Sequence, residues 1–257
     1  MKERRIDIQT PDGAMETFIT QPGGNGPFPA VILYMDIWGV REELFDIARR
    51  IATVGYYCVV PDLYYRQGRV RHEFRNERNQ TISSDLLDER RREAARASRE
   101  ALTDAMVVQD TQSLLDFIDH GEPVRPGAMG CLGYCMGGRH VFLVAGQFPQ
   151  RFRASASLHG TSLVTDRPES PHKVAAKLMG ELYCGFAEKD RNATPATIKA
   201  LDEAFRNCAV KYRYEMHQGA DHGYALPDRD VYDKQAANRD WELVFAMFRR
   251  QIPPFSE

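Results

Sequence analysis

The stretch "LGYCMGGRH", Leu132 to His140, decides how this chain folds. An apolar run precedes it and an apolar, helix-like run follows it, so the glycines mark a sharp turn from a strand into a helix. The spacing of Gly133, Cys135 and Gly137 matches the G-x-S-x-G turn that presents a catalytic nucleophile, with cysteine in place of serine. Small residues are needed two positions before and after the nucleophile because the backbone closes tightly there. Cys135 is therefore a candidate nucleophile; the alternatives are a redox thiol and an inert thiol buried in a glycine-rich bend.

Apolar strand-like runs alternate with amphipathic helical runs on both sides of this turn. The chain opens with two alternating segments around the turn "PDGA", which predict a hairpin. The later strands are continuous apolar runs, as expected for a parallel sheet covered on both faces. The pattern predicts an α/β fold with a mostly parallel twisted sheet, helices on both faces and an N-terminal antiparallel hairpin. After the hairpin, the expected strands are 30–35, 56–61, 128–134, 154–160, 181–190 and 211–217, and the expected helices are 41–55, 106–118, 137–148, 194–208 and 233–250.

The amino-acid composition changes little along most of the chain, which bears on the number of domains. No linker, repeat or low-complexity tract interrupts it, so we expect a single domain over residues 1–257. Residues 66–100 differ from the rest because they carry ten arginines and few apolar side chains. We interpret this segment as a solvated, partly helical excursion from the domain that could serve as a lid.

Charge, hydropathy and cysteine content exclude several classes of protein. The 34 basic and 36 acidic residues give a net charge of -2, which offers no reason to expect nucleic-acid binding. No apolar run approaches the ~20 residues of a membrane span, and the charged N-terminus does not resemble a signal peptide. The five cysteines lack paired spacing, so we expect free thiols, a cytoplasmic location and neither a metal nor a cofactor.

A nucleophile of this kind needs a base and an acid that orients the base, and in such enzymes they follow the nucleophile in the order acid, base. His222 lies in "GADHGYALP", between the last strand and the last helix, at the sheet edge where the turn lies. Asp190 lies at the tip of the loop after "ELYCGFA", whereas Asp221 is in the wrong place in the order. We predict His222 as the base and Asp190 as the acid. His159 could line the pocket, and His217 is expected to be packed.

Taken together, these motifs resemble the dienelactone hydrolase family, a cysteine branch of the α/β-hydrolase fold. The resemblance implies Cys135 as nucleophile, with Asp190 and His222 completing the triad. It also implies a carboxylate, here Asp36, that contacts the resting thiol and limits its ionisation until substrate binds. The fold analogy places the oxyanion hole at the backbone N–H groups of Ile37 and Met136. The landmarks in order are "DIWGV" (36–40), "PDLYYRQG" (61–68), "DERRRE" (88–93), "GYCMGG" (133–138), "GFAEKD" (185–190) and "GADHGYA" (219–225).

The resemblance also bears on the substrate. The family member that cleaves dienelactones holds the substrate carboxylate with two arginines. Arg92 matches the first, but the second position, four residues after the histidine, is Leu226 here. Trp38 and Tyr134 are expected to form an aromatic wall of the pocket.

These observations predict a hydrolase that cleaves a small-molecule lactone or carboxylic ester through a Cys–His–Asp triad and a thioester acyl-enzyme. Two alternatives remain open at this point. One is a broad-specificity carboxylesterase or thioesterase without dienelactone activity, which Leu226 favours. The other is a non-catalytic binding or redox-sensing protein on the same scaffold. The sequence does not define the oligomeric state.

Overall fold

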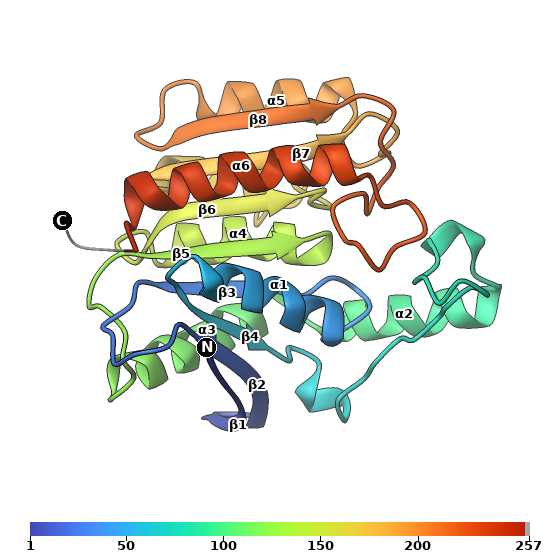
Figure 1. Ribbon diagram of the computed structural model, residues 1–257. Helices are drawn as coiled ribbons and strands as arrows, with labels where there is room; N and C mark the ends of the chain where they lie inside the picture. The colour runs from blue at the N-terminus through green and yellow to red at the C-terminus, as the bar shows by residue number, and fades with distance from the viewer. Residues whose placement is uncertain (255–257) are drawn as a thin grey trace.

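The computed structural model describes residues 1–254 and contains one eight-stranded sheet (Figure 1). The strand order is β1-β2-β4-β3-β5-β6-β7-β8, and the six strands from β4 to β8 run parallel. The central strands are buried along their whole length, which explains why their sequences are continuously apolar. The strands are β1 (Lys2–Thr10), β2 (Gly13–Gln21), β3 (Ala30–Tyr34), β4 (Tyr57–Pro61), β5 (Met129–Tyr134), β6 (Phe152–Leu158), β7 (Glu181–Ala187) and β8 (Lys211–His217).

The N-terminal hairpin forms one edge of this sheet. β1 pairs antiparallel with β2, in a register that places Thr10 opposite Gly13, and β2 pairs antiparallel with β4. Most side chains of β1 are exposed, whereas those of the second half of β2 are buried. The predicted α/β fold, with its parallel sheet and antiparallel hairpin, is confirmed.

Five of the six α-helices in residues 1–254 cover the two faces of the sheet. In Figure 1, α1 and α6 lie in front of the sheet, and α3, α4 and α5 lie behind it. α1 illustrates the pattern, because Leu44, Ile47, Ala48 and Ile51 are buried at helical spacing. The helices are α1 (Glu42–Thr53), α2 (Glu89–Ala101), α3 (Asp104–Asp119), α4 (Met136–Gln147), α5 (Pro195–Phe205) and α6 (Lys234–Gln251), with short 3-10 segments η1 (Tyr65–Gln67), η2 (Ser84–Leu86) and η3 (Pro171–Lys177).

The strand order places a topological switch point at β3. The chain passes from β3 to β4 on one side and later returns with β5 on the other side. In open α/β sheets, ligands bind outside the carboxyl ends of the strands at such a point. The loops after β3 and β5, which contain Asp36 and Cys135, both begin there.

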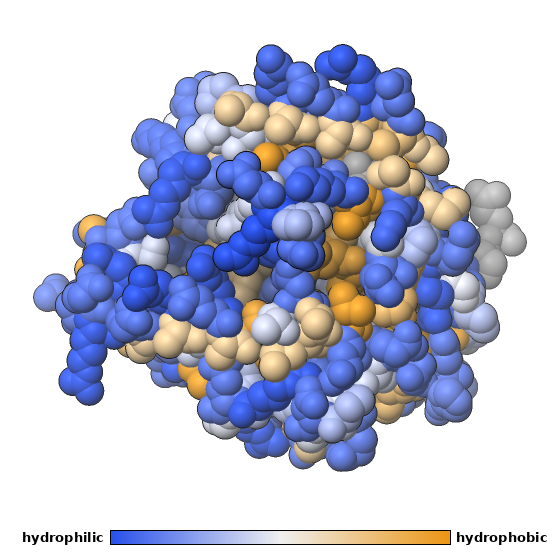
Figure 2. All heavy atoms as spheres, turned by 180° about the vertical axis from the view of Figure 1, so that it is seen from behind, coloured by the Kyte–Doolittle hydropathy of each residue, from blue (hydrophilic) through white to orange (hydrophobic). Residues whose placement is uncertain are grey.

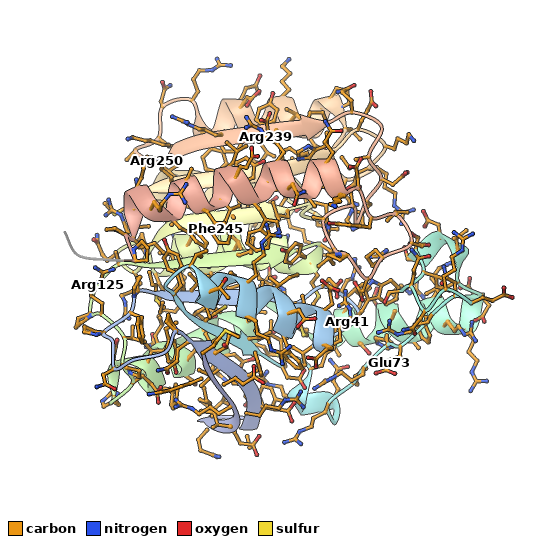
Figure 3. The ribbon with its side chains drawn as sticks, viewed as in Figure 1. Arg41, Glu73, Arg125, Arg239, Phe245 and Arg250 are labelled. Carbon is orange, nitrogen blue, oxygen red and sulfur yellow. The ribbon has the colours of Figure 1, made fainter. Side chains whose placement is uncertain are left out.

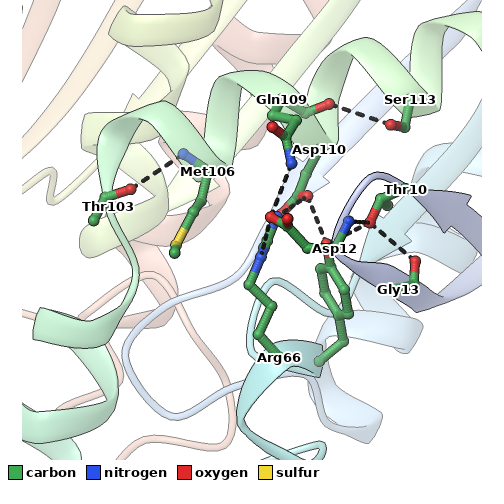
Figure 4. Close-up of polar contacts among 10 residues, drawn as sticks. Thr10, Asp12, Gly13, Arg66, Thr103, Met106, Gln109, Asp110 and Ser113 are labelled. Atoms are coloured by element: carbon green, nitrogen blue, oxygen red, sulfur yellow. Dashed lines mark hydrogen bonds and ion pairs between the residues drawn. The ribbon is translucent and has the colours of Figure 1, made fainter.

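The segment from η1 to α2 leaves the body of the sheet, and α2 projects from the molecule (Figure 1). Seen from behind, this projection is mostly hydrophilic, in keeping with its arginines (Figure 2). Arg66 anchors its beginning, because the guanidinium binds Asp110 of α3 at 2.7 and 2.8 Å and Asp12 of the hairpin turn at 2.8 Å (Figure 4).

A second anchor holds the middle of this segment to the loop after β8. The Thr81 N–H donates to the backbone oxygen of Asp228, and the Asp230 N–H donates to the Thr81 oxygen. Ser83 donates to the Asp230 carboxylate through both its N–H and its hydroxyl, at 2.9 and 2.8 Å. We call residues 81–83 with residues 228–230 the strap; it joins two distant parts of the chain.

Candidate active site

Cys135 occupies the predicted turn between β5 and α4. Its backbone has φ 54° and ψ -114°, a conformation that L-residues rarely adopt and that is kept here by the surrounding structure. The Cys135 N–H donates to the Leu158 oxygen, and its own carbonyl accepts from Gly138 and Thr161. The turn therefore holds the thiol at the carboxyl edge of the sheet, at the start of a helix.

The flanking glycines are required by close approach of the backbone. A Cβ atom on Gly133 would lie 2.1 Å from the Gly137 oxygen, and one on Gly137 would lie 2.4 Å from the Tyr34 oxygen. Neither contact can be relieved by turning a side chain, because both partners are backbone atoms. The glycine pattern thus reflects the geometry of a nucleophile turn.

Two backbone N–H groups next to the thiol are available to an oxyanion. Met136 is the first residue of α4, where an N–H has no partner within the helix. The Ile37 N–H, in the loop after β3, likewise donates to no acceptor among residues 1–254. Both residues line the same cavity as Cys135. Their placement agrees with the oxyanion hole expected from the fold analogy, and the helix dipole adds to the attraction for negative charge.

His222 and Asp190 meet in this cavity from two different loops. The Nδ1 atom of His222 lies 2.5 Å from Oδ2 of Asp190. The other oxygen of Asp190 accepts from the N–H and side-chain amide of Asn192, at 2.8 and 2.9 Å. Burial raises the pKa of Asp190, but the hydrogen bonds and charge of His222 and Asn192 outweigh it and hold the pKa below its usual value.

The imidazole of His222 is polarised toward its charged form. Burial lowers the pKa of His222, but the negative charge of Cys135 and the hydrogen bond to Asp190 outweigh it and raise the pKa to about 10. The side chain is 28% exposed, so the ring faces the cavity and remains accessible to substrate. The three predicted triad residues are therefore brought together around one cavity.

The cavity lined by Cys135, Asp190 and His222 has a volume of about 620 Å³, within the usual range for a small-molecule site, and is called the catalytic cavity here because it holds the candidate catalytic residues. Trp38 forms part of its wall, as expected. Arg229 stands over the Trp38 ring, with the guanidinium carbon 5.5 Å from the ring centre, and is only 3% exposed. Nε of Arg229 is buried and has no hydrogen bond among the described residues, although the charge of Arg229 helps to lower the pKa of Asp228. A buried guanidinium that lacks a direct hydrogen-bonded carboxylate is a candidate for an anion contact.

Asp36 is buried beside the site, but its carboxylate is already bound. Arg41 donates to both of its oxygens, at 2.7 and 3.0 Å, and the Trp38 N–H donates at 3.0 Å. Arg41 also binds both oxygens of Asp228, at 2.7 and 3.1 Å, from the start of α1 (Figure 3). Among the described residues no hydrogen bond joins Asp36 to Cys135, so the carboxylate would have to release Arg41 before it could hold the thiol.

Arg92 and Tyr134 do not line the catalytic cavity. The Arg92 guanidinium instead donates to the backbone oxygens of Leu87 and Ser84, because its helix begins next to that loop. Tyr134 ends β5 and is fully buried against His159. The cavity-lining cations that the sequence reasoning did not assign are Lys189, Arg191, Arg99 and Arg229. Arg99 follows Arg92 by two helical turns, a spacing that could have identified it.

The other histidines near the site have structural surroundings. His159 is completely buried, and its ring packs edge-on against His222 at 5.0 Å. His217 binds Asp240 at 2.7 Å, as expected for a packed histidine. Within residues 1–254, no group of three or more His, Cys, Asp or Glu side chains is arranged to bind a metal ion. None of the helices in this range is long and apolar enough to cross a membrane.

Comparison with known proteins places the chain in a family. Residues 15–252 match the model of the dienelactone hydrolase family. This chain therefore belongs to the dienelactone hydrolase family and is a hydrolase, as predicted. A Synechocystis sp. relative named "Putative carboxymethylenebutenolidase" is 26% identical, with 98% of both chains aligned. A Methylorubrum extorquens relative of the same name is 27% identical over 95% of this chain and 80% of its own.

Solved structures show the same fold. The "Putative Dienelactone Hydrolase" of Klebsiella pneumoniae superposes with a TM-score of 0.82 at 24% identity, covering 97% of this chain and 98% of the other. The dienelactone hydrolase-like promiscuous phosphotriesterase P91 superposes with a TM-score of 0.76 at 18% identity, with the same coverage. These similarities support the α/β-hydrolase fold.

Proposed function

We propose that this protein hydrolyses a lactone or carboxylic ester through the triad Cys135, His222 and Asp190. The observation that carries the proposal is the strained backbone of Cys135, which presents the thiol to the cavity where His222 binds Asp190. Structural thiols need no such strain, whereas a nucleophile gains accessibility from it.

The proposed reaction has two stages. The Cys135 thiolate attacks the ester carbon, and the oxygen that gains charge is held by the N–H groups of Ile37 and Met136. The tetrahedral intermediate expels the alcohol, which takes a proton from His222, and a thioester remains. His222 then removes a proton from water, which attacks the thioester and releases the acid and the thiol. Asp190 keeps the imidazole oriented and stabilises its charge throughout.

Cys135 contributes to the raised pKa of the His222 imidazole through its charge and a hydrogen bond, so Cys135→Ala removes both contributions. We expect NMR titration of the His222 ring to give a lower pKa in Cys135→Ala than in the wild type. A His222 pKa that is unchanged by the substitution would contradict this coupling between the two side chains.

The raised pKa of His222 also makes the stability of the folded protein depend on pH. A raised histidine pKa stabilises the folded state fully below the unfolded value near ~6.5, and the contribution is lost as pH rises toward about 10. The stability difference between wild type and His222→Gln should therefore shrink across that range.

Arg229 is proposed to select substrates that carry an anionic group on the leaving-group side. It lies beside the His222 loop and is buried without a carboxylate partner. We expect Arg229→Met to lower kcat/KM for 4-acetoxybenzoate by ~10-fold or more, the value of a lost charge-assisted hydrogen bond. The methyl ester of the same compound should be affected far less. Arg191→Met is the matched control, because Arg191 lines the same cavity but is 79% exposed. Equal losses on the charged and methylated substrates would remove the proposed role.

A broader carboxylesterase or thioesterase activity is the second candidate. Arg92 turns away from the cavity and Leu226 is buried, so neither position supplies a cation to the cavity. A panel of lactones, aryl esters and thioesters, each with and without a carboxylate, separates this candidate from a dienelactone-like activity.

A further inference from the structure

Tyr64 lies behind the candidate oxyanion hole and has no role in the reaction proposed above. It follows β4 at the carboxyl edge of the sheet, and its side chain is completely buried. It does not line the catalytic cavity, so it does not touch a substrate bound there. Any effect of Tyr64 on the reaction must therefore pass through the residues that its side chain contacts.

The Tyr64 hydroxyl contacts both residues whose N–H groups are available to an oxyanion. It donates to the backbone oxygen of Ile37 at 3.1 Å, and it lies 3.8 Å from Sδ of Met136. The carbonyl is the stronger acceptor, so the proton points to Ile37 and the thioether packs against the hydroxyl. Ile37 follows β3 and Met136 begins α4, so one hydroxyl joins two segments that are distant in the chain.

The Ile37 carbonyl that accepts this bond belongs to a peptide unit that is held at both ends. The N–H of the same unit, from Trp38, donates to Oδ1 of Asp36 at 3.0 Å. The preceding unit carries the Ile37 N–H, and its carbonyl, from Asp36, accepts from Gly39 at 3.3 Å. These two planar units share the Cα atom of Ile37, so fixing the second limits how the first can turn. The Tyr64 bond therefore restrains the direction of the Ile37 N–H.

Buried neighbours fix both the protonation and the position of the phenol. Burial and the negative charges of Asp36 and Cys135 raise the pKa of Tyr64 above its ordinary value, against the opposing charge of Arg99. The hydroxyl therefore keeps its proton and remains a donor. The Tyr64 N–H donates to Oδ1 of the buried Asp62 at 3.0 Å, which holds the residue just after β4.

We propose that Tyr64 is a positioning residue of the oxyanion hole, whose hydroxyl aligns the N–H of Ile37 with that of Met136 so that both point to one oxygen. Hydrogen bonds weaken steeply with misalignment, so an oxyanion needs both donors in fixed directions. Such alignment favours the transition state over the bound substrate, because the full charge develops only during the reaction. This inference rests on the proposed function, because it concerns the oxyanion of the same reaction.

The first test is Tyr64→Phe, which removes the hydroxyl and keeps the ring. We expect kcat for p-nitrophenyl butyrate to fall by ~10-fold, the value of one neutral hydrogen bond, while KM stays within ~2-fold. Tyr57→Phe is the matched control, because the buried Tyr57 donates to Glu122 at 2.5 Å but stands at the opposite end of β4. This variant should keep the wild-type kcat.

The two chemical steps give a readout that a general loss of stability would not move. Acylation and deacylation each pass through an oxyanion in the same hole, so Tyr64→Phe should slow the burst of p-nitrophenol and the steady rate by similar factors. The factor should also be the same for phenyl butyrate, because Tyr64 acts on the oxyanion and not on the proton transfer by His222. A loss confined to one step, or one that grows with the basicity of the leaving group, would overturn the proposal.

A covalent analogue reports on the oxyanion itself. The Cys135 thiolate adds to the carbonyl carbon of 1,1,1-trifluoro-4-phenylbutan-2-one, and the π electron pair of the carbonyl becomes the oxyanion of a hemithioketal. With ¹³C at the carbonyl carbon, an NMR titration gives the pKa of that oxygen. We expect this pKa to be higher in Tyr64→Phe than in the wild type and unchanged in Tyr57→Phe. Equal pKa values in Tyr64→Phe and the wild type would contradict the positioning role.

Failure of this inference and failure of the proposed function give different results. If the wild type cleaves esters and Tyr64→Phe keeps its full kcat, the positioning role is wrong and the proposed function stands. If the wild type neither cleaves esters nor forms the hemithioketal, the proposed function is wrong and the role of Tyr64 falls with it. Amide NMR of the free protein adds a check without chemistry: Tyr64→Phe should shift the Ile37 N–H signal and speed its hydrogen exchange. An unchanged Ile37 signal would show that the hydroxyl does not restrain this N–H.

Discussion

Cys135→Ala is expected to reduce kcat for any ester substrate by about a thousandfold or more, because no other group at the turn can form the acyl-enzyme. The fold should be retained, since the side chain removed is small and the backbone of residue 135 still donates to Leu158 and accepts from Gly138 and Thr161. Steady-state kinetics with a circular dichroism spectrum and a thermal midpoint would measure both effects. Mass spectrometry of the wild type, quenched during turnover, should show the acyl group on the peptide that contains Cys135.

The control for this experiment is Cys208→Ala. Cys208 is the one free cysteine that is not buried, and it lies outside the cavity. Its loss should leave turnover at the wild-type level, while Cys135 alone accounts for inactivation by iodoacetamide. A Cys135→Ala protein that retains wild-type rates would disprove the mechanism. Full labelling of Cys135 without loss of any hydrolase activity would support a binding or redox role instead.

Arg41→Met is expected to lower the free energy of unfolding strongly, because Arg41 is a buried cation that two carboxylates share. Asp36 and Asp228 both depend on this guanidinium, and Asp36 is fully buried. Burial lowers the pKa of Arg41, but the two carboxylates outweigh it and raise the pKa above its ordinary value, so the arginine is always charged. Removing it leaves two carboxylates without a cation, which costs about 3–5 kcal/mol. Urea unfolding would measure this change.

Arg49→Met provides a matched comparison on the same helix. Arg49 also binds three carboxylates, Glu3, Glu42 and Asp46, but these are largely exposed. Its loss should cost about 1 kcal/mol or less. If the free energy of unfolding falls by about 1 kcal/mol or less in both variants, the contacts of Arg41 with Asp36 and Asp228 do not stabilise the fold more than the exposed ion pairs do. A triple variant with Asp36→Asn and Asp228→Asn should recover part of the loss, because no buried charge then lacks a partner.

The sequence predicted the parallel sheet, the hairpin and the meeting of Cys135, Asp190 and His222. These depend on local patterns, because strand runs, glycine spacing and the order of loops along the chain determine which residues reach one sheet edge. Asp36 was predicted to contact the thiol of Cys135, whereas its carboxylate accepts hydrogen bonds from Arg41. Arg41 is only five residues away, but nothing in the pattern shows that its side chain folds back while also reaching Asp228.

The cations of the cavity were the least predictable feature. Arg92 and Arg99 share one helix, and which of them faces the cavity depends on how that helix leaves the body of the fold. Charge runs carry no apolar periodicity to fix such an orientation. The sequence shows that Arg229 lies close to His222 along the chain. It does not show that Arg229 is buried over Trp38, because that burial results from tertiary packing.

The strap described above has a consequence for how this enzyme could acquire new specificity. Residues 81–83 and 228–230 belong to the two segments that contribute Ser83, Ser84 and Arg229 to the cavity, and they are joined by backbone hydrogen bonds as well as by side chains. A segment attached in this way cannot swing open independently of the histidine loop. We therefore expect an exchange of residues 81–86 between relatives to preserve the fold of this segment only when residues 228–230 are exchanged with them.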